Sequence, residues 1–259
     1  MTGQPATRSN ELLDEINNLG AADRDNAFLL KSLERKATQV LRTGDYSGGY
    51  TLLGALAAVR GDAEETRSQH AKAVAVAPSD TDVLRNYAIS LLRVGLIEDA
   101  ITMADRSWQL DKTQVQNLVL LTQLTLHSGR VQGAVERLRS ENLSWQNDAQ
   151  VAELESAASF LAKKGVTDTV AGVIAREAMK VVAPISVTGV QNRVASDDET
   201  TWVDFALTVN DTVEKVMELN HNLAERLAEL TLDSELGRAS AAFVVRFTRT
   251  VSLDASSSN

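Results

Sequence analysis

The chain contains 259 residues and no cysteine, and it carries a formal net charge of −9. Disulfides, thiolate metal sites and a cysteine nucleophile are therefore excluded, and nucleic-acid binding is disfavoured because it requires a basic surface. Hydrophobic residues make up 44% of the chain and aromatic residues only 4%, which favours closely packed helices over a β-sandwich. The sequence has neither an apolar run of about 18 residues nor a secretory signal at its start, so we expect a cytoplasmic protein without membrane contact.

Two helices are predicted before the repetitive part of the chain begins. Residues 1–9 have the polar composition of a disordered tail. Asn10 is a candidate N-cap of a short helix that stops at Gly20, and Asp23 or Asp25 begins a second helix that ends near Thr43. The apolar residues at helical spacing are Leu12, Leu13, Ile16 and Leu19 in the first helix and Phe28, Leu29, Leu33, Ala37, Val40 and Leu41 in the second.

Three glycines, Gly61, Gly95 and Gly129, recur every 34 residues, and each lies in a short polar break between two apolar runs. A glycine adopts the left-handed conformation of a tight helix–helix turn without the strain that a Cβ atom adds. Helices are predicted over residues 47–60 and 63–76, and two further pairs surround the second and third glycines. Because neither helix of a pair can bury its apolar face alone, successive pairs must stack into a solenoid.

Ala100 and Ala134 each lie five residues after their glycine, where the first unit has Thr66. The first unit also contains Ala73 and the closing Pro78. With the period and the turn glycines, they make residues 47–140 resemble the tetratricopeptide repeat. The resemblance implies a solenoid whose first helices line a concave groove that holds an extended peptide or a helix of a partner protein. The chain departs from the family where Leu84 and Leu118 replace a bulky aromatic residue and Lys112 replaces the closing proline of the second unit.

The same resemblance implies which side chains face the groove. The candidate partner-binding residues on the first helices of the second and third units are Arg85, Asn86, Arg93, Gln116, Gln123 and His127. The first unit contributes Thr51, Leu52, Ala55 and Val59. Guanidinium and amide groups bond the backbone or a carboxylate of a bound peptide. The carboxylate clamp of some family members is not predicted, because Thr51 and Ala55 stand where it needs a lysine and an asparagine.

The pattern changes after Asp148. The predicted elements are helices over 149–164 and 167–182, strands over 185–194 and 201–209, a helix over 211–230 and a strand over 241–251. Gly189 suggests a bulge in the first strand. The order strand, strand, helix, strand predicts a three-stranded sheet with its first strand in the middle and helix 211–230 on one face. Helix 167–182, or a second copy of the protein, is expected to help cover this small sheet.

The predicted fold class is therefore α+β. A tetratricopeptide-like helical repeat domain with capping helices is expected over residues 10–164, and a small C-terminal α/β domain over residues 165–253. Residues 254–259 form a second, serine-rich tail that we expect to be disordered.

Two acidic clusters are the candidate metal ligands. Glu218, His221 and Glu225 share one face of the predicted helix 211–230, and Asp197-Asp198-Glu199 form a polar loop. The solvated face of an amphipathic helix and a hairpin loop carry such side chains without a metal, so we expect neither a metal nor another cofactor. The chain has no phosphate-binding glycine loop and no nucleophile-elbow serine, and no catalytic residue is predicted.

These observations leave three hypotheses. The first is a non-enzymatic adaptor or scaffold that binds a partner protein in the groove. Its C-terminal domain would form a homodimer or bind a second partner through an unpaired edge or the open sheet face with Trp202, Ala206 and Val244. The second is a dedicated chaperone or inhibitor of a single effector protein, which the acidic charge fits. The third is an enzyme with its site around His221 in the C-terminal domain.

Overall fold

A computed structural model describes residues 8–19, 23–141, 148–182, 187–230 and 234–249. The N-terminal helices are α1 (Arg8–Asn17), α2 (Ala27–Arg42), α3 (Tyr46–Arg60), α4 (Ala63–Val76), α5 (Thr81–Arg93), α6 (Ile97–Leu110) and α7 (Val115–His127). The elements that follow are α8 (Val131–Ser140), α9 (Asp148–Lys163), α10 (Asp168–Val182), β1 (Val187–Ser196), β2 (Thr201–Val209), α11 (Val213–Leu230), α12 (Ser234–Ala242) and β3 (Phe243–Arg249). None of the helices in the described ranges has the length and apolar character of a bilayer-spanning segment.

Contacts divide the chain into two compact units, one that reaches Ser128 and one that begins at Gly129. The first unit contains α1 to α7, and the second contains α8 to α12 and the sheet. The predicted domain boundary at residue 165 lies later than this division, because α8 packs on α9 and α9 packs on β1 and β2. The fold class is α+β, as predicted.

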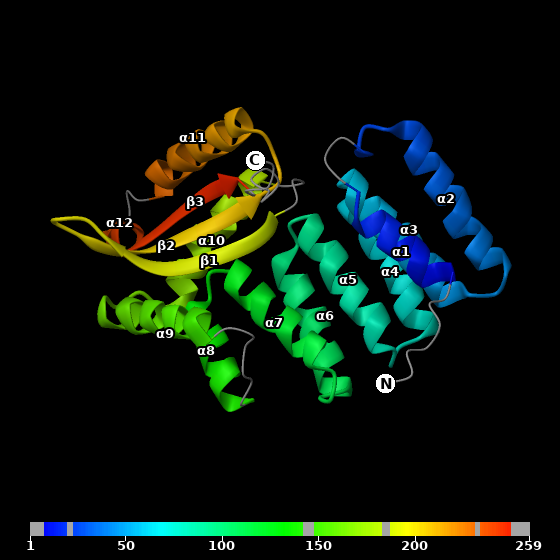
Figure 1. Cartoon of the computed structure of the whole chain (residues 1–259), viewed down its shortest axis with the longest axis horizontal. Helices are drawn as coiled ribbons and strands as arrows, with labels where there is room; N and C mark the ends of the chain where they lie inside the picture. The colour runs from blue at the N-terminus through cyan, green and yellow to red at the C-terminus, as the bar shows by residue number, and fades with distance from the viewer. Residues whose placement is uncertain (1–7, 20–22, 142–147, 183–186, 231–233, 250–259) are drawn as a thin grey trace, which may run out of the picture. The chain divides into compact units, whose positions relative to one another are not determined.

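In the first unit, successive helices from α2 to α7 lie side by side (Figure 1). The helices α3 and α4 pack as one pair and α5 and α6 as the next, as the glycine spacing predicts. The first helices also contact one another, α3 with α5 and α5 with α7, whereas the second helices α4 and α6 pack less closely and are joined by the ion pair between Arg67 and Asp99. We call the more closely spaced layer of α3, α5 and α7 the inner layer.

Glycine and aspartate residues determine the turns between helices. Gly61, Gly95 and Gly129 all have a φ of 78°, which confirms the predicted left-handed turns. Asp62 caps α4 by accepting a hydrogen bond from the backbone N–H of Glu65 (2.9 Å), which satisfies a donor that the helix leaves unpaired. The predicted helix over residues 63–76 is confirmed, and its partner begins one residue earlier than the predicted 47.

Two predicted helix starts are wrong. The helix α1 begins at Arg8 rather than after Asn10, so the last two residues of the predicted 1–9 tail are helical; residues 1–7 and 254–259 lie outside the described residues. The helix α2 begins after Asn26 rather than at Asp23 or Asp25. The reason is local, because the Asn26 side-chain oxygen accepts the backbone N–H of Leu29 at 3.0 Å.

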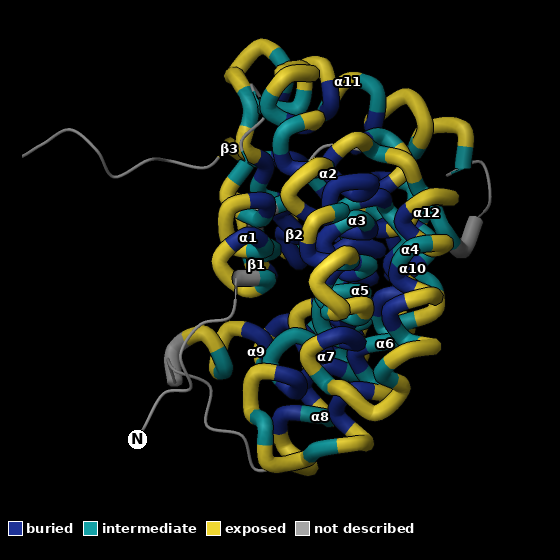
Figure 2. Tube along the Cα trace, turned by 90° about the vertical axis from the view of Figure 1, so that its right-hand side faces the viewer, coloured by how far each residue is buried: buried dark blue, intermediate teal, exposed yellow. Residues whose placement is uncertain are grey.

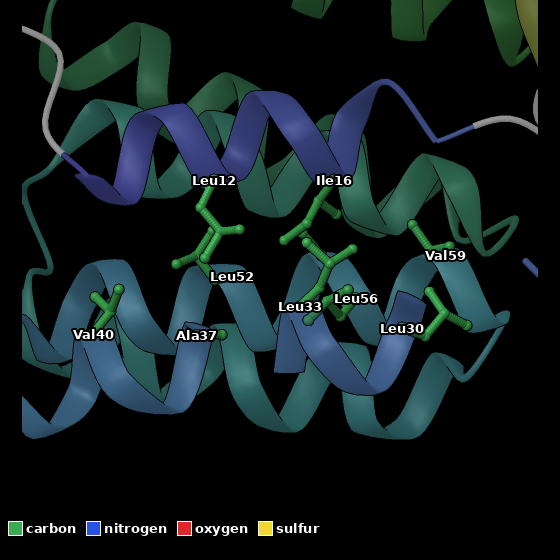
Figure 3. Close-up of a cluster of buried hydrophobic side chains, with 10 residues drawn as sticks. Leu12, Ile16, Leu30, Leu33, Ala37, Val40, Leu52, Leu56 and Val59 are labelled. Carbon is green, nitrogen blue, oxygen red and sulfur yellow. The ribbon is translucent and has the colours of Figure 1, made fainter. Parts of the chain in front are cut away.

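The short helix α1 is part of the hydrophobic core of the first unit. Leu12 and Ile16 point from α1 toward α2 and α3 (Figure 3). The core residues that they join are Leu30, Leu33, Ala37, Val40, Leu52, Ala55, Leu56 and Val59. Because Ile16 is completely buried and Leu12 is 6% exposed, the two side chains together contribute on the order of 3–6 kcal/mol of apolar burial.

In the second unit the strand order is β1-β2-β3, so the prediction that the first strand lies in the middle is wrong. The central strand is β2, which pairs antiparallel with β1 and parallel with β3. Figure 2 shows β2 as largely buried. Its predicted inward residue Phe205 is fully buried, and Asp204 and Ala206 on the opposite face are buried as well. A strand buried on both faces belongs in the centre of a sheet rather than at its edge.

Helices α10, α11 and α12 pack on β3, so the predicted covering of the sheet by the helix at 167–182 is confirmed. The helix α12 was not predicted, and it shortens the last strand, which begins at Phe243 instead of residue 241. Alanines at 241 and 242 favour the helix over the strand. The predicted irregularity near Gly189 is confirmed by a register shift between Val187 and Gly189.

Two glycines with positive φ provide a test of the turn geometry. A Cβ atom added at Gly129 would lie 2.8 Å from the carbonyl oxygen of Ala171, whereas one added at Gly44, with a φ of 95°, would contact nothing within 4 Å. We expect Gly44→Ala to lower the free energy of unfolding by about 1 kcal/mol through backbone strain alone. We expect Gly129→Ala to lower it by at least about 3 kcal/mol, because steric overlap is added. Urea unfolding followed by circular dichroism measures both, and equal losses would contradict the geometry.

Candidate functional site

The first unit contains an open cavity of ≈ 390 Å³ framed by the N-terminal ends of α1, α3 and α5. Its polar lining includes Asp45, Asp80, Asp82, Thr51 and Asn86. Its apolar lining includes Leu13, Leu52 and Val83. A concave site of this volume with a few converging polar groups is a typical binding pocket.

Helix capping places two of the carboxylates. Asp45 precedes α3 and accepts hydrogen bonds from the backbone N–H of Gly48 and from the hydroxyl of Ser9 on α1, both at 2.9 Å. Asp80 precedes α5, and one of its oxygens accepts the backbone N–H groups of Asp82 (2.9 Å) and Val83 (3.2 Å). The lining carboxylates are therefore held where the helices begin, and their positions do not depend on a ligand.

Thr51 has an unusual hydroxyl group. Other helical threonines donate a hydrogen bond from the hydroxyl to the backbone carbonyl oxygen one turn earlier; they are Thr38, Thr66, Thr102, Thr122 and Thr125. The Thr51 side chain is only 5% exposed, and its oxygen has no hydrogen-bond partner in the described part of the chain. A buried hydroxyl without a partner is costly, and Thr51 is one of the residues that line the cavity.

Three polar contacts hold α1 beside the cavity. Ser9 bonds Asp45 at its start, and Lys36 of α2 pairs with Glu15 at 2.9 Å. At the other end of α1, Arg93 donates to the carbonyl oxygen of Asn17 (3.0 Å). Burial lowers the pKa of Arg93. The prediction that Arg93 faces the groove as a partner-binding residue is therefore corrected, because its guanidinium group anchors the end of α1.

The other predicted residues on α5 lie where a ligand can reach them. Asn86 lines the cavity. Arg85 is half-buried beside it and pairs with Asp82 at 2.8 Å. This salt bridge holds the guanidinium group next to the rim of the cavity.

The three predicted residues on α7 behave differently from one another. Gln116 and Gln123 are exposed. His127 is only 6% exposed, and its Nδ1 lies 2.7 Å from the carbonyl oxygen of Gln123. Burial lowers the pKa of His127. The prediction that His127 faces a partner is thus corrected, since the ring bonds its own helix.

The first unit also differs from the prediction. Leu52, Ala55 and Val59 were predicted to face the groove, but they are buried in the core that α1 and α2 complete. Of the four residues predicted there, Thr51 and Leu52 line the cavity. The spacing of Leu12 and Ile16 did indicate an apolar face on α1, but it gave no partner for that face.

The acidic clusters of the second unit form ordinary helix and turn contacts. His221 lies 3.5 Å from Glu225, and both are largely exposed. Glu218 pairs with Lys215 at 2.9 Å. In the hairpin, Asp197 accepts the backbone N–H of Thr200 at 2.7 Å, and such hydrogen bonds lower its pKa. Within the described ranges, no three His, Asp or Glu side chains come together as a possible metal site.

A salt-bridge network covers one face of the sheet. Asp204 on β2 accepts hydrogen bonds from Arg246 on β3 at 2.6 and 2.8 Å and from Arg193 on β1 at 3.0 Å. These bonds, above all those from Arg246, lower the pKa of Asp204. The predicted docking face is therefore less open than expected, because Ala206 is buried and Trp202 is half-buried.

The comparisons with known proteins give no relative. No family model, no curated protein and no solved structure matches this chain.

A buried histidine packs against the helices of the inner layer. His70 of α4 is completely buried and stacks on Tyr87 of α5 with ring centroids 4.8 Å apart. Gly54 of α3 makes the space, since a Cβ atom there would lie 2.3 Å from the ring. Neither ring nitrogen bonds a described residue, and burial lowers the pKa of His70 to about 3.

This histidine makes stability depend on pH. Because its pKa of about 3 in the folded protein is below the usual value of about 6.5, the unfolded chain binds the proton first. Stability is therefore fully present above about pH 6.5 and falls toward pH 3 by up to about 1.4 kcal/mol per pH unit. We expect His70→Leu to remove this part of the slope in urea titrations at several pH values. His221→Leu, at an exposed histidine, is the control, and an unchanged slope in His70→Leu would contradict the assignment.

Proposed function

We propose that the protein is a non-enzymatic interaction module that binds a peptide or helix of another protein across its inner layer. The observation that carries this proposal is the cavity beside α5, whose lining residue Asn86 belongs to the same layer as the exposed Gln116 and Gln123 of α7. Amide side chains of this kind bond the backbone of an extended ligand. Arg85 adds a charged donor for a carboxylate or a carbonyl group.

The repeat pattern supports the same proposal. The packed pairs α3 with α4 and α5 with α6, spaced by 34 residues and each turned by a glycine with a φ of 78°, fit a solenoid of the tetratricopeptide type. Solenoids present the closely spaced layer of helices as an extended binding surface.

One helix of the chain itself already packs on this layer. The amphipathic helix α1 packs on α3 through Leu12 and Ile16. An apolar stripe and polar ends are the recognition mode of a helix bound in a groove. We therefore propose that a partner contacts α5 and α7, next to the part of the layer that α1 covers.

We further propose that the second unit forms a homodimer or binds a second partner through its sheet. Trp202 and Val244 remain half-buried on the face that carries Asp204. The free edge of β3 is a weaker candidate, because Asn220 of α11 already bonds both the N–H (2.8 Å) and the carbonyl oxygen (3.0 Å) of Phe247. Backbone groups that are already bonded, as at Phe247, do not recruit another strand.

The proposal predicts that partner capture depends on the inner layer. We expect the double variant Gln116→Arg and Gln123→Arg to retain less than about one fifth of the partner that the wild-type chain captures, because bulk and charge are added at the contact. Affinity purification from the source cells with quantitative mass spectrometry measures the captured amount.

The matched control is Gln109→Arg on α6, which adds the same charge at an exposed residue of the other layer. Its capture should equal that of the wild-type chain. Equal capture by all the variants, or equal losses in all of them, would contradict binding on the inner layer.

A further inference from the structure

We propose that the cavity between α1, α3 and α5 binds an organic cation, the ammonium or guanidinium group of a lysine or arginine side chain presented by the partner peptide. This inference rests on the proposed function for the source of the ligand, but the cavity itself supplies the chemistry.

The charge of the lining favours a cation. Asp45, Asp80 and Asp82 line the cavity, and none of its described lining residues is basic. Arg85 lies outside the lining and pairs with Asp82 alone. No ion pair joins Asp45 or Asp80 to a basic side chain of the described residues. Two carboxylates without a cationic partner that converge on one space attract a positive charge.

The helix N-termini do not reverse this preference. Each N-terminus carries only about half an elementary positive charge, whereas each carboxylate carries a full negative one. Three N–H groups at these N-termini are already used, because Gly48 donates to Asp45 and Asp82 and Val83 donate to Asp80. The carboxylate oxygens that accept these bonds keep further lone pairs for a donor.

Thr51 is the independent sign of a ligand. Thr51 is one of the residues that line the cavity, and its buried hydroxyl has no hydrogen-bond partner among the described residues. An ammonium group has three donors and no acceptor, so it bonds a hydroxyl oxygen together with carboxylate oxygens. Thr51 and Asp45, both from the first two turns of α3 or its cap, can serve two of these donors.

The remaining lining fits the stem of the same side chain. Leu13, Leu52 and Val83 supply an apolar surface beside the acidic groups. Lysine and arginine bury their methylene stems on apolar surface while their charged ends stay with polar partners. The volume of ≈ 390 Å³ accommodates one such side chain with part of its backbone.

The test uses the full-length ¹⁵N-labelled chain and nuclear magnetic resonance titrations that follow the amide signals of Gly48 and Val83. The probes are the blocked tripeptides acetyl-Gly-Lys-Gly-amide and acetyl-Gly-norleucine-Gly-amide, which differ in the ammonium group, and acetyl-Gly-Glu-Gly-amide. We expect saturable shifts with the lysine peptide only, weakened at least about threefold when NaCl rises from about 20 to about 200 mM.

Three variants assign the binding to the cavity. We expect Thr51→Val, which keeps the side-chain shape, to weaken the lysine peptide about threefold or more. We expect Asp45→Asn to weaken it about fivefold or more, while asparagine keeps the helix cap. Thr38→Val and Asp62→Asn are the matched controls, because Thr38 bonds Glu34 and Asp62 caps α4 outside the cavity. Thermal unfolding confirms that each variant is folded.

The possible results distinguish the cation site, its assignment to a peptide ligand and the interaction module. Equal binding of the norleucine peptide, binding of the glutamate peptide instead, or no shift with any probe would overturn the cation site. Equal weakening by Asp62→Asn would show a general charge effect and overturn it as well. Binding of 1,5-diaminopentane as tight as that of the lysine peptide would overturn the assignment to a peptide. If these tests fail while capture still depends on Gln116 and Gln123, the interaction module stands without the cation site.

Discussion

The apolar contact between α1 and the pair α2 and α3 determines what the inner layer of the first unit offers to a ligand. Leu12 and Ile16 close a core that includes Leu33 and Leu56, and they cover the first part of the layer. The same placement makes α1 one wall of the cavity. Without α1, Asp45 and Thr51 would line an open surface instead of a pocket. The helix thus removes apolar surface from the layer and gives it an enclosed polar site.

The stack below this site depends on small residues where helices approach closely. Gly54 leaves the space that the buried ring of His70 occupies. Gly61 and Gly95 adopt the left-handed conformation that returns the second helix of each pair onto the first. Because α3 packs on α5 and α5 packs on α7, the surface of these three helices is continuous. A continuous surface with exposed amides at Gln116 and Gln123 suits the binding that we propose.

Much of the helical architecture was predictable because glycine and aspartate fix helix ends locally. The turn at Gly61 and the helix at 63–76 were found from these signals. The start of α2 was missed because Asn26 competes with two nearby aspartates as the cap. The central position of β2 was missed because the alternation of Phe205 and Asp204 suggested that one face of the strand is exposed to solvent.

The candidate site was only partly predictable. Asn86, Gln116 and Gln123 follow from helical periodicity and the resemblance. The hydrogen bond of Arg93 to Asn17 and the burial of His127 do not, because both depend on the neighbours that tertiary packing brings to each helix. The hydroxyl of Thr51, which has no partner within the described ranges, likewise cannot be predicted from the sequence, since a helical threonine normally bonds its own backbone.

The most direct test of a partner on the inner layer is site-specific photo-crosslinking in the source cells. A photoreactive phenylalanine analogue placed at Asn86 or Gln123 should form a crosslink to the same partner protein. The analogue placed at Gln109 on α6, which is exposed on the other layer, should form none with that protein. Crosslinks to it from Gln109, with none from Asn86 or Gln123, would contradict the account.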